Sequence, residues 1–177
     1  MKKTTASPHP YRLSATDLSN YISCRHLTLL DKQAADGTLE KPTPKDPYAA
    51  LVQELGMRHE AAYVAHLQAQ GHQVADLREG SDQIQRTLDA MREGAEVIVQ
   101  AKLDNGKWGG YADLLLKVDK KSNLGDWSYK VADTKLAQHT KAGTVLQLCV
   151  YSDLVSQIQG VDPDHIHVIM RKPFNTS

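Results

Sequence analysis

Aromatic residues are scarce in this sequence, and neither sign of charge is in excess. Only 6% of the 177 residues are aromatic, which argues against a large aromatic-rich binding face. Lysine and arginine together number 21, as do aspartate and glutamate, so the chain as a whole presents no positive field to a polyanionic partner. Any affinity for nucleic acid must therefore come from a local basic patch or from a bound cation.

Cysteines and long apolar runs are scarce as well. Cys24 and Cys149 are too few and too far apart for a disulfide framework, and neither belongs to a closely spaced set of cysteines and histidines, so we expect free, buried thiols. No stretch approaches the roughly 20 apolar residues of a membrane span, and the basic N-terminus lacks the apolar core of a signal peptide. These absences predict a soluble, cytoplasmic protein without a membrane partner.

The length of the chain suits one domain. Residues 1–12 are polar and contain proline, so we expect a disordered N-terminal segment, followed by a single domain over residues 13–177. The sequence stops soon after an expected strand without an obvious closing element, which favours a longer parent protein.

Apolar periodicity and capping signals predict the secondary structure. One helix of about four turns begins after Ser14, which has Asp17 three residues later, and stops before Asp36. In the next helix, residues Leu51, Leu55, Ala62 and Leu67 lie on or near one face, with His59 on the same stripe. The further elements expected are helices over 47–70, 81–94 and 145–158, and strands over 72–77, 97–99, 107–118, 127–136 and 165–170.

The three middle strands are joined by short turns, so we expect an antiparallel meander within a mixed central β-sheet flanked by helices, an α/β fold. If the turn between the second and third of these strands is centred near Asn123, Asp113 and Asp133 lie opposite one another, each ten residues from the centre. Like charges opposed across a sheet are destabilising, so this pair needs a cation or a shared proton.

Lys135 follows Asp133 by two residues and therefore projects from the same face of the strand. Oxygen ligands, a divalent cation and an ammonium group suit phosphodiester hydrolysis, in which Mg²⁺ or Mn²⁺ acidifies water and Lys135 orients it or stabilises negative charge. An isolated Asp-x-Lys triplet is more often a surface ion pair. The opposed Asp113 and the following helix with Gln147 and Tyr151 on one face favour the catalytic interpretation.

Four segments of the chain, in their order and rough spacing, resemble the RecB-like branch of the PD-(D/E)xK nuclease superfamily. They are residues 56–60 (Gly-Met-Arg-His-Glu), 110–113 (Gly-Tyr-Ala-Asp), 133–135 (Asp-Thr-Lys) and 147–151 (Gln-Leu-Cys-Val-Tyr). The segments at 13–18 and 24–28 also resemble the opening of RecB-like nucleases that are often joined to a helicase. The resemblance implies a restriction-endonuclease-like core over roughly residues 13 to 170.

The resemblance also implies roles for individual residues. The metal ligands would be His59, Asp113 and Asp133, to which we add the backbone carbonyl of Thr134, and Lys135 would be catalytic. Gln147 and Tyr151 would support the site or contact DNA. Asp133 stands where many members have glutamate. The aspartate side chain is shorter but can still coordinate a metal. His59 and its neighbour do not form a zinc-protease motif, because position 63 is tyrosine where that motif needs a second histidine.

Exposed basic groups near the expected site offer the local patch that DNA phosphates need. His139 and Lys141 follow the catalytic strand directly, with Arg58 and Lys130 as further candidates, although a solvated charged loop is an equally good interpretation. Some relatives carry an iron-sulfur cluster held by one early and three late cysteines. Cys24 resembles the early one and the late three are absent, so we expect no cluster in this chain.

The sequence therefore predicts a metal-dependent deoxyribonuclease acting in DNA repair, recombination or processing, with single- or double-stranded DNA as substrate and a helicase as a candidate partner domain. The alternative is a catalytically inactive nucleic-acid-binding or helicase-docking module with the same fold. A hydrolase of another phosphate ester fits the same ligands and ranks last.

Overall fold

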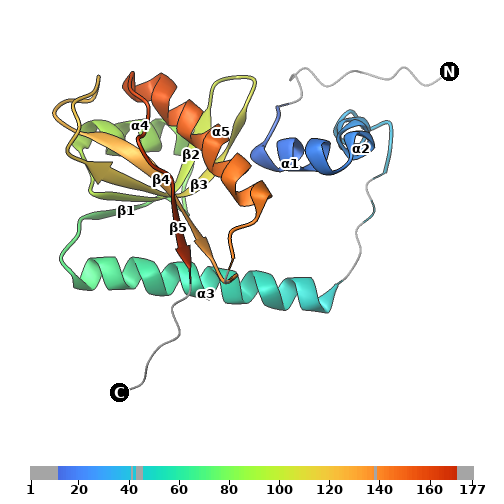
Figure 1. Cartoon of the computed structure of the whole chain (residues 1–177), viewed down its shortest axis with the longest axis horizontal. Coiled ribbons are helices and arrows are strands. Elements are labelled where there is room, and N and C mark those ends of the chain that lie inside the picture. The colour runs from blue at the N-terminus through green and yellow to red at the C-terminus, as the bar shows by residue number, and fades with distance from the viewer. Residues whose placement is uncertain (1–11, 41, 43–45, 138, 171–177) are drawn as a thin grey trace.

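The computed structural model describes residues 12–40, 42, 46–137 and 139–170, and its centre is a five-stranded sheet in the order β1-β2-β3-β4-β5 (Figure 1). The strands are β1 (Val74–Asp76), β2 (Val97–Asp104), β3 (Gly109–Val118), β4 (Ser128–Lys135) and β5 (His167–Met170). The helices are α1 (Ala15–Ser23), α2 (Arg25–Ala35), α3 (Pro47–Ala69), α4 (Gln83–Glu93) and α5 (Ala142–Gln159). The segment expected to be disordered, residues 1–12, lies outside the described residues except for Arg12.

The pairing of the strands makes the sheet mixed. β2, β3 and β4 form an antiparallel meander, while β1 pairs with β2 and β5 with β4 in parallel. The parallel pairs require crossover connections, and helices α4 and α5 supply them. The expected α/β class with a mixed sheet, an antiparallel meander and flanking helices is confirmed.

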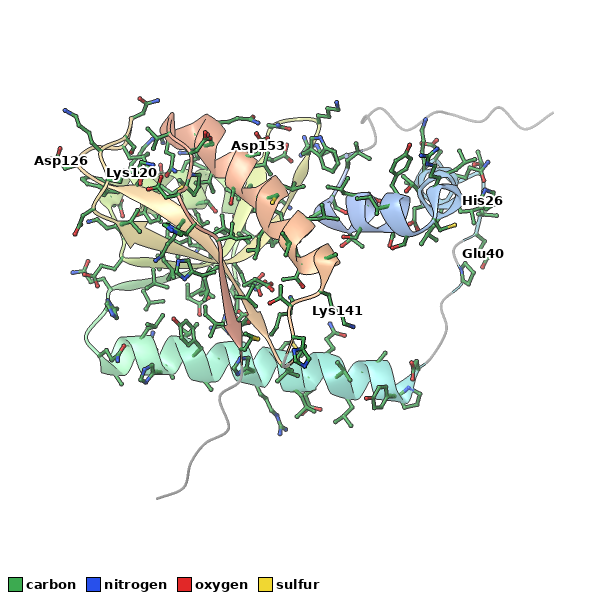
Figure 2. The ribbon with its side chains drawn as sticks, in the orientation of Figure 1. His26, Glu40, Lys120, Asp126, Lys141 and Asp153 are labelled. Carbon is green, nitrogen blue, oxygen red and sulfur yellow. The ribbon has the colours of Figure 1, made fainter. Side chains whose placement is uncertain are left out.

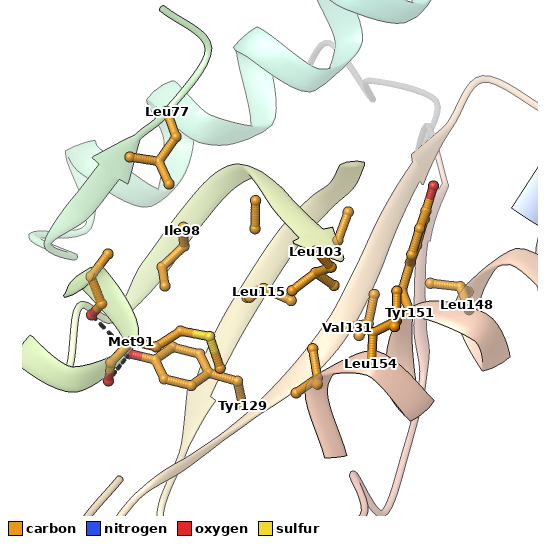
Figure 3. Packing of buried hydrophobic residues seen from close by; sticks show 14 of the residues in the cluster. Leu77, Met91, Ile98, Leu103, Leu115, Tyr129, Val131, Leu148, Tyr151 and Leu154 are labelled. Atoms are coloured by element: carbon orange, nitrogen blue, oxygen red, sulfur yellow. Dashed lines mark hydrogen bonds between the residues drawn. The ribbon is translucent and has the colours of Figure 1, made fainter. Parts of the chain in front are cut away.

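Helices cover both faces of the sheet. Val64 and Leu67 of α3 pack on one face against β2, β3 and β4, whereas α4 and α5 pack on the other face with the larger core cluster. Figure 3 shows part of this larger cluster, in which the Tyr129 ring lies beside Met91. The Tyr129 hydroxyl is 2.8 Å from the carbonyl of Ala95, so this polar atom has a partner inside the core.

The prediction of one helix after Ser14 is wrong in one respect, because the helix breaks at Cys24, whose backbone is extended (φ −158°, ψ 104°). Its start is confirmed: the Asp17 amide donates to Ser14 Oγ, and the Ser14 amide donates to the Asp17 carboxylate. Folding back at Cys24 lets Asn20 donate to Asp31 across the two helices, a bond between residues 11 apart that a continuous helix does not allow.

The apolar face predicted for the second helix is largely wrong. Leu51 and Leu55 are 51% and 40% exposed, Ala62 is exposed too, and of the four predicted positions only Leu67 is buried. The reason is the position of the sheet edge: the N-terminal half of α3 extends past the sheet, so its apolar residues have no strand beneath them (Figure 1). Among the described helices, none combines the length and the low polarity needed to cross a membrane.

Candidate active site

The two aspartates of the predicted site occupy facing positions on adjacent strands. Leu114 pairs with Ala132 and Leu115 with Val131, so the next facing positions are Asp113 and Asp133, and the predicted centre at Asn123 is confirmed. The backbone N–H of Thr134 donates to Oδ2 of Asp113 over 3.2 Å. This bond fixes the Asp113 carboxylate toward β4.

Asp133 is buried, with 2% of its surface exposed. Its Oδ1 accepts a hydrogen bond from Lys135 Nζ at 2.7 Å, whereas its Oδ2 is buried and has no hydrogen-bond partner among the described residues. Burial, and then the neighbouring Asp113 carboxyl, raise the pKa of Asp133 to about 7, against the opposing effect of Lys135. The carboxylate pair is therefore short of positive charge, and one lysine does not supply enough of it.

Lys135 lies two residues after Asp133 on β4, and the two side chains meet as the strand period requires. About a third of the Lys135 side chain is exposed, while Asp133 is almost fully buried. The ammonium group thus stands between the buried carboxylate and solvent, where an incoming anion can reach it.

Two polar residues that the sequence reasoning missed join this group. Gln100 of β2 faces Asp113 across the β2–β3 pair, between Val99↔Leu114 and Ala101↔Ala112. Its Nε2 donates to the Glu60 carboxylate on α3 over 3.0 Å. Burial, and next the charge of Asp113, raise the pKa of Glu60.

The backbone at Gln100 is in the left-handed region, with a φ of +54°. Such a φ is uncommon for a residue other than glycine and marks local strain. Two signals in the sequence pointed to this place: a glutamine interrupting the apolar run after Val99, and a glutamate directly after His59.

The ring of the expected metal ligand His59 contacts β5, at the residue that pairs with Thr134 of β4. Its Nε2 lies 3.4 Å from the carbonyl oxygen of Ile169 on β5, to which a ring N–H donates. Within the described ranges, no three histidine, cysteine, aspartate or glutamate side chains lie close enough together to hold a metal ion. The structure brings Asp113, Asp133 and Lys135 together, and it leaves His59 outside a three-ligand cluster.

Tyr151 reaches the site from α5. It is 6% exposed, and burial, followed by the charge of Asp113, raises its pKa, while hydrogen bonds from Gln147 and from the backbone of Tyr111 lower it. The predicted pair of Gln147 and Tyr151 on one helix face therefore lies beside Asp113.

The remaining predicted residues are peripheral. His139 and Lys141 are exposed just before α5, and Figure 2 shows Lys141 at the start of that helix. Arg58 on α3 is paired with Glu54 over 2.7 Å. The two cysteines are free, but both are exposed, so the expectation of buried thiols is wrong.

No family model, no curated protein and no solved structure matches this chain. What the chain does has to be inferred from the geometry of the site and from its sequence pattern.

Proposed function

We propose that this protein is a metal-dependent nuclease that hydrolyses DNA phosphodiester bonds. Its active site would consist of Asp113, Asp133 and Lys135. The observation that carries the proposal is the state of Asp133, a buried carboxylate whose Oδ2 has no hydrogen-bond partner among the described residues and which faces a second carboxylate. A buried carboxylate pair destabilises a fold unless a cation or proton compensates it, so such a pair is found where it has a use.

The donor set fits Mg²⁺ or Mn²⁺, which prefer carboxylate and carbonyl oxygens. Asp113, Asp133 and the backbone carbonyl of Thr134 would hold the ion, with water completing its coordination. His59 ranks below these ligands because its ring is engaged with the Ile169 carbonyl. When bound, the ion supplies Lewis acidity, which makes water a better nucleophile and polarises a phosphate oxygen.

The other residues of the site act on the position and charge of the reacting groups. Lys135, partly exposed and bonded to Asp133, would orient the attacking water or stabilise the negative charge that develops on phosphate. Tyr151 and Gln147 would hold the Asp113 side of the site from α5. The basic residues His139 and Lys141, exposed next to β4, would contact phosphates along the strand.

The family assignment belongs to the same proposal. An aspartate on one strand, an Asp-x-Lys on the antiparallel neighbour and a helix with glutamine and tyrosine after it follow the order of the RecB-like PD-(D/E)xK nucleases, with a restriction-endonuclease-like core. A role in DNA repair, recombination or processing, within a parent protein that carries a helicase, follows from this resemblance.

A second candidate is a catalytically inactive nucleic-acid-binding or helicase-docking module. The close ion pair between Lys135 and Asp133 favours it, because in such a module this pair would be purely structural. The two candidates differ in whether substitution of these residues changes cleavage.

The test incubates end-labelled single- and double-stranded DNA with the purified protein in Mg²⁺, in Mn²⁺ and in chelator. Asp133→Asn and Lys135→Ala are expected to reduce the cleavage rate on the order of 100-fold or more, the loss typical of a charged catalytic group. The exposed Asp126→Asn and Lys107→Ala serve as matched controls that keep the wild-type rate. Equal cleavage by all five proteins would overturn the assigned site.

Metal binding has its own measurement in the melting temperature. A ligand that binds only the folded state raises it, so Mg²⁺ or Mn²⁺ should stabilise the wild type and should stabilise Asp133→Asn much less. Cation-dependent stabilisation and DNA binding without cleavage would favour the inactive module.

A further inference from the structure

A cavity of about 410 Å³ opens beside Glu60 and Gln100. Its walls are Met57, Glu60, Arg78, Gln83, Gln100 and Tyr111. Glu60 and Gln100 are hydrogen-bonded to each other, and Gln100 faces Asp113 in the sheet. The cavity therefore shares a wall with the candidate active site.

Tyr111 places an aromatic ring at a fixed distance from the site. It precedes Asp113 by two residues on β3, roughly 7 Å along the strand, and lines the same cavity as Gln100, which faces Asp113. This separation suits a nucleotide whose phosphate would be bound by the cation at Asp113. No proposed role in the hydrolysis uses this ring.

The Tyr111 ring is held in place by its hydroxyl. The hydroxyl donates to Gln83 Oε1 over 2.7 Å and accepts from Lys102 Nζ over 2.9 Å. Lys102 Nζ lies 4.5 Å from the ring centroid, yet 39% of the tyrosine remains exposed. A rigid, partly exposed ring is what a base can stack on without a large loss of side-chain entropy.

Cationic groups flank this ring. Arg78 Nε lies 3.0 Å from each carboxylate oxygen of Asp76, which holds the guanidinium at the cavity wall. Lys102 also lines a second hollow, together with residues 80–85, and Gln83 belongs to both hollows. The two hollows therefore adjoin at Gln83, with Arg78 in the wall of the first and Lys102 in the wall of the second.

We propose that this cavity is a base-binding subsite, in which Tyr111 stacks on the base of a nucleotide next to the phosphate that is hydrolysed at the Asp113 and Asp133 site. The inference rests on the proposed function and adds a specificity-determining residue to it. An aromatic ring in the wall of a cavity can stack on a base only if that base has left its duplex, so the nucleotide bound there is unpaired. Arg78 and Lys102 contact its backbone as sequence-independent cations.

The test measures binding without cleavage, with a short fluorescein-labelled oligothymidylate, Ca²⁺ in place of Mg²⁺, and fluorescence anisotropy. Tyr111→Ala should weaken binding by roughly 5- to 150-fold, the range for the loss of one stacked base, while Tyr111→Phe should stay within about threefold of the wild type. Tyr48→Ala removes an exposed tyrosine of α3 far from the cavity and serves as the matched control. Equal affinities of Tyr111→Ala and Tyr48→Ala overturn the proposal.

A second measurement does not depend on how well Tyr111→Ala folds. Oligothymidylates with one abasic position, moved stepwise along the strand, should show one position at which wild-type binding falls, and Tyr111→Ala should no longer distinguish that position. A uniform response along the strand overturns the subsite, and so does a total absence of oligothymidylate binding.

The two proposals fail separately. Tyr111-dependent, position-dependent binding with no cleavage in Mg²⁺ or Mn²⁺ keeps the subsite and removes the nuclease activity. Cleavage that depends on Asp133 and Lys135, with no effect of Tyr111→Ala or of the abasic position, keeps the nuclease and removes the subsite.

Discussion

Gly110 on β3 lies directly against the hydroxyl of Tyr151 on α5. A Cβ built on Gly110 would lie 2.6 Å from this oxygen and 2.9 Å from the ring Cε1, closer than side-chain carbons approach other atoms. Glycine is therefore required here for space, and its absent side chain is what allows α5 to bring Tyr151 beside Asp113. The Gly-Tyr-Ala-Asp segment thus serves the site through its first residue as well as its last.

Gly110→Ala should displace Tyr151 and destabilise the protein. Overpacking a tight contact costs about 1–3 kcal/mol in the free energy of unfolding, measured by urea denaturation. Gly56→Ala is the matched control, because a Cβ at this helical position meets no atom within 4 Å. Alanine in a helix is favoured over glycine, so Gly56→Ala should stabilise by about 0.5–1 kcal/mol. A Gly110→Ala variant as stable as the wild type would contradict the close contact.

Asp113→Asn should stabilise the metal-free protein at alkaline pH. The pKa of Asp133 is raised to about 7 in the folded state, above its value in an unfolded chain, so ionisation of Asp133 opposes folding. The stabilisation of the fold by the uncharged form of Asp133 is fully present below about pH 4 and is lost as the pH rises through about 7. Removing the charge of Asp113 relieves this loss, and the amide oxygen that the substitution introduces can still accept from the Thr134 N–H.

The expected measurement is a thermal melt in chelator at about pH 8 and about pH 5. A relief on the order of 1 kcal/mol raises the melting temperature by about 2–4 °C in a domain of this size at the higher pH, with a smaller change at the lower pH. Asp126→Asn, which removes an exposed charge, should leave both melts unchanged. A stabilisation by Asp113→Asn that is equal at both pH values would argue against a coupled pair.

The sequence was informative where a rule of local geometry applied. β3 and β4 are joined directly by residues 119–127, and antiparallel pairing about the centre of this connection predicts from the distances to Asn123 that Asp113 and Asp133 face each other. The two-residue period of a strand likewise put Lys135 beside Asp133. These predictions needed no knowledge of how the helices pack.

Where tertiary structure decides, the sequence was insufficient. The apolar periodicity of α3 carries no information about where the sheet ends. Leu51 and Leu55 were therefore expected in a core that does not extend to them. Glu60 and Gln100 meet because α3 crosses over β2, and residues 40 positions apart give no local sign of such a contact. His59 was a candidate through family resemblance alone, and its bond to Ile169 depends on β5, more than 100 residues away.

Position 100 should prefer glycine to alanine, the reverse of the usual order in a strand. Gln100 has a φ of +54°, which costs roughly 1–2 kcal/mol for any residue with a Cβ. Gln100→Ala keeps this strain and loses the bond to Glu60, whereas Gln100→Gly loses the bond but releases the strain. We expect the glycine variant to be more stable in urea denaturation, with Ala101→Gly as a control that shows the ordinary penalty. An alanine variant more stable than the glycine variant would contradict the strained backbone.

Gln159 at the end of α5 replaces a missing strand beside β4. β5 pairs with β4 only from Ala132 onward, which leaves Tyr129 beyond the end of that pairing. The Tyr129 amide donates to Gln159 Oε1 over 2.7 Å, and Gln159 Nε2 donates to the Tyr129 carbonyl over 3.1 Å and to that of Val161 over 3.0 Å. Gln159 is fully buried, so one side chain satisfies both backbone groups of a core residue.

Gln159→Leu should therefore destabilise the protein by about 2–4 kcal/mol, because it keeps the volume of the side chain and leaves the two Tyr129 backbone groups buried without partners. Urea denaturation measures the loss, and hydrogen exchange at the Tyr129 amide should accelerate beyond the change at other β4 amides. Gln157→Leu, an exposed glutamine on the same helix, should cost less than about 0.5 kcal/mol. If the two leucine variants are equally stable, water or a backbone shift satisfies Tyr129 and the side chain of Gln159 is dispensable at this edge of the sheet.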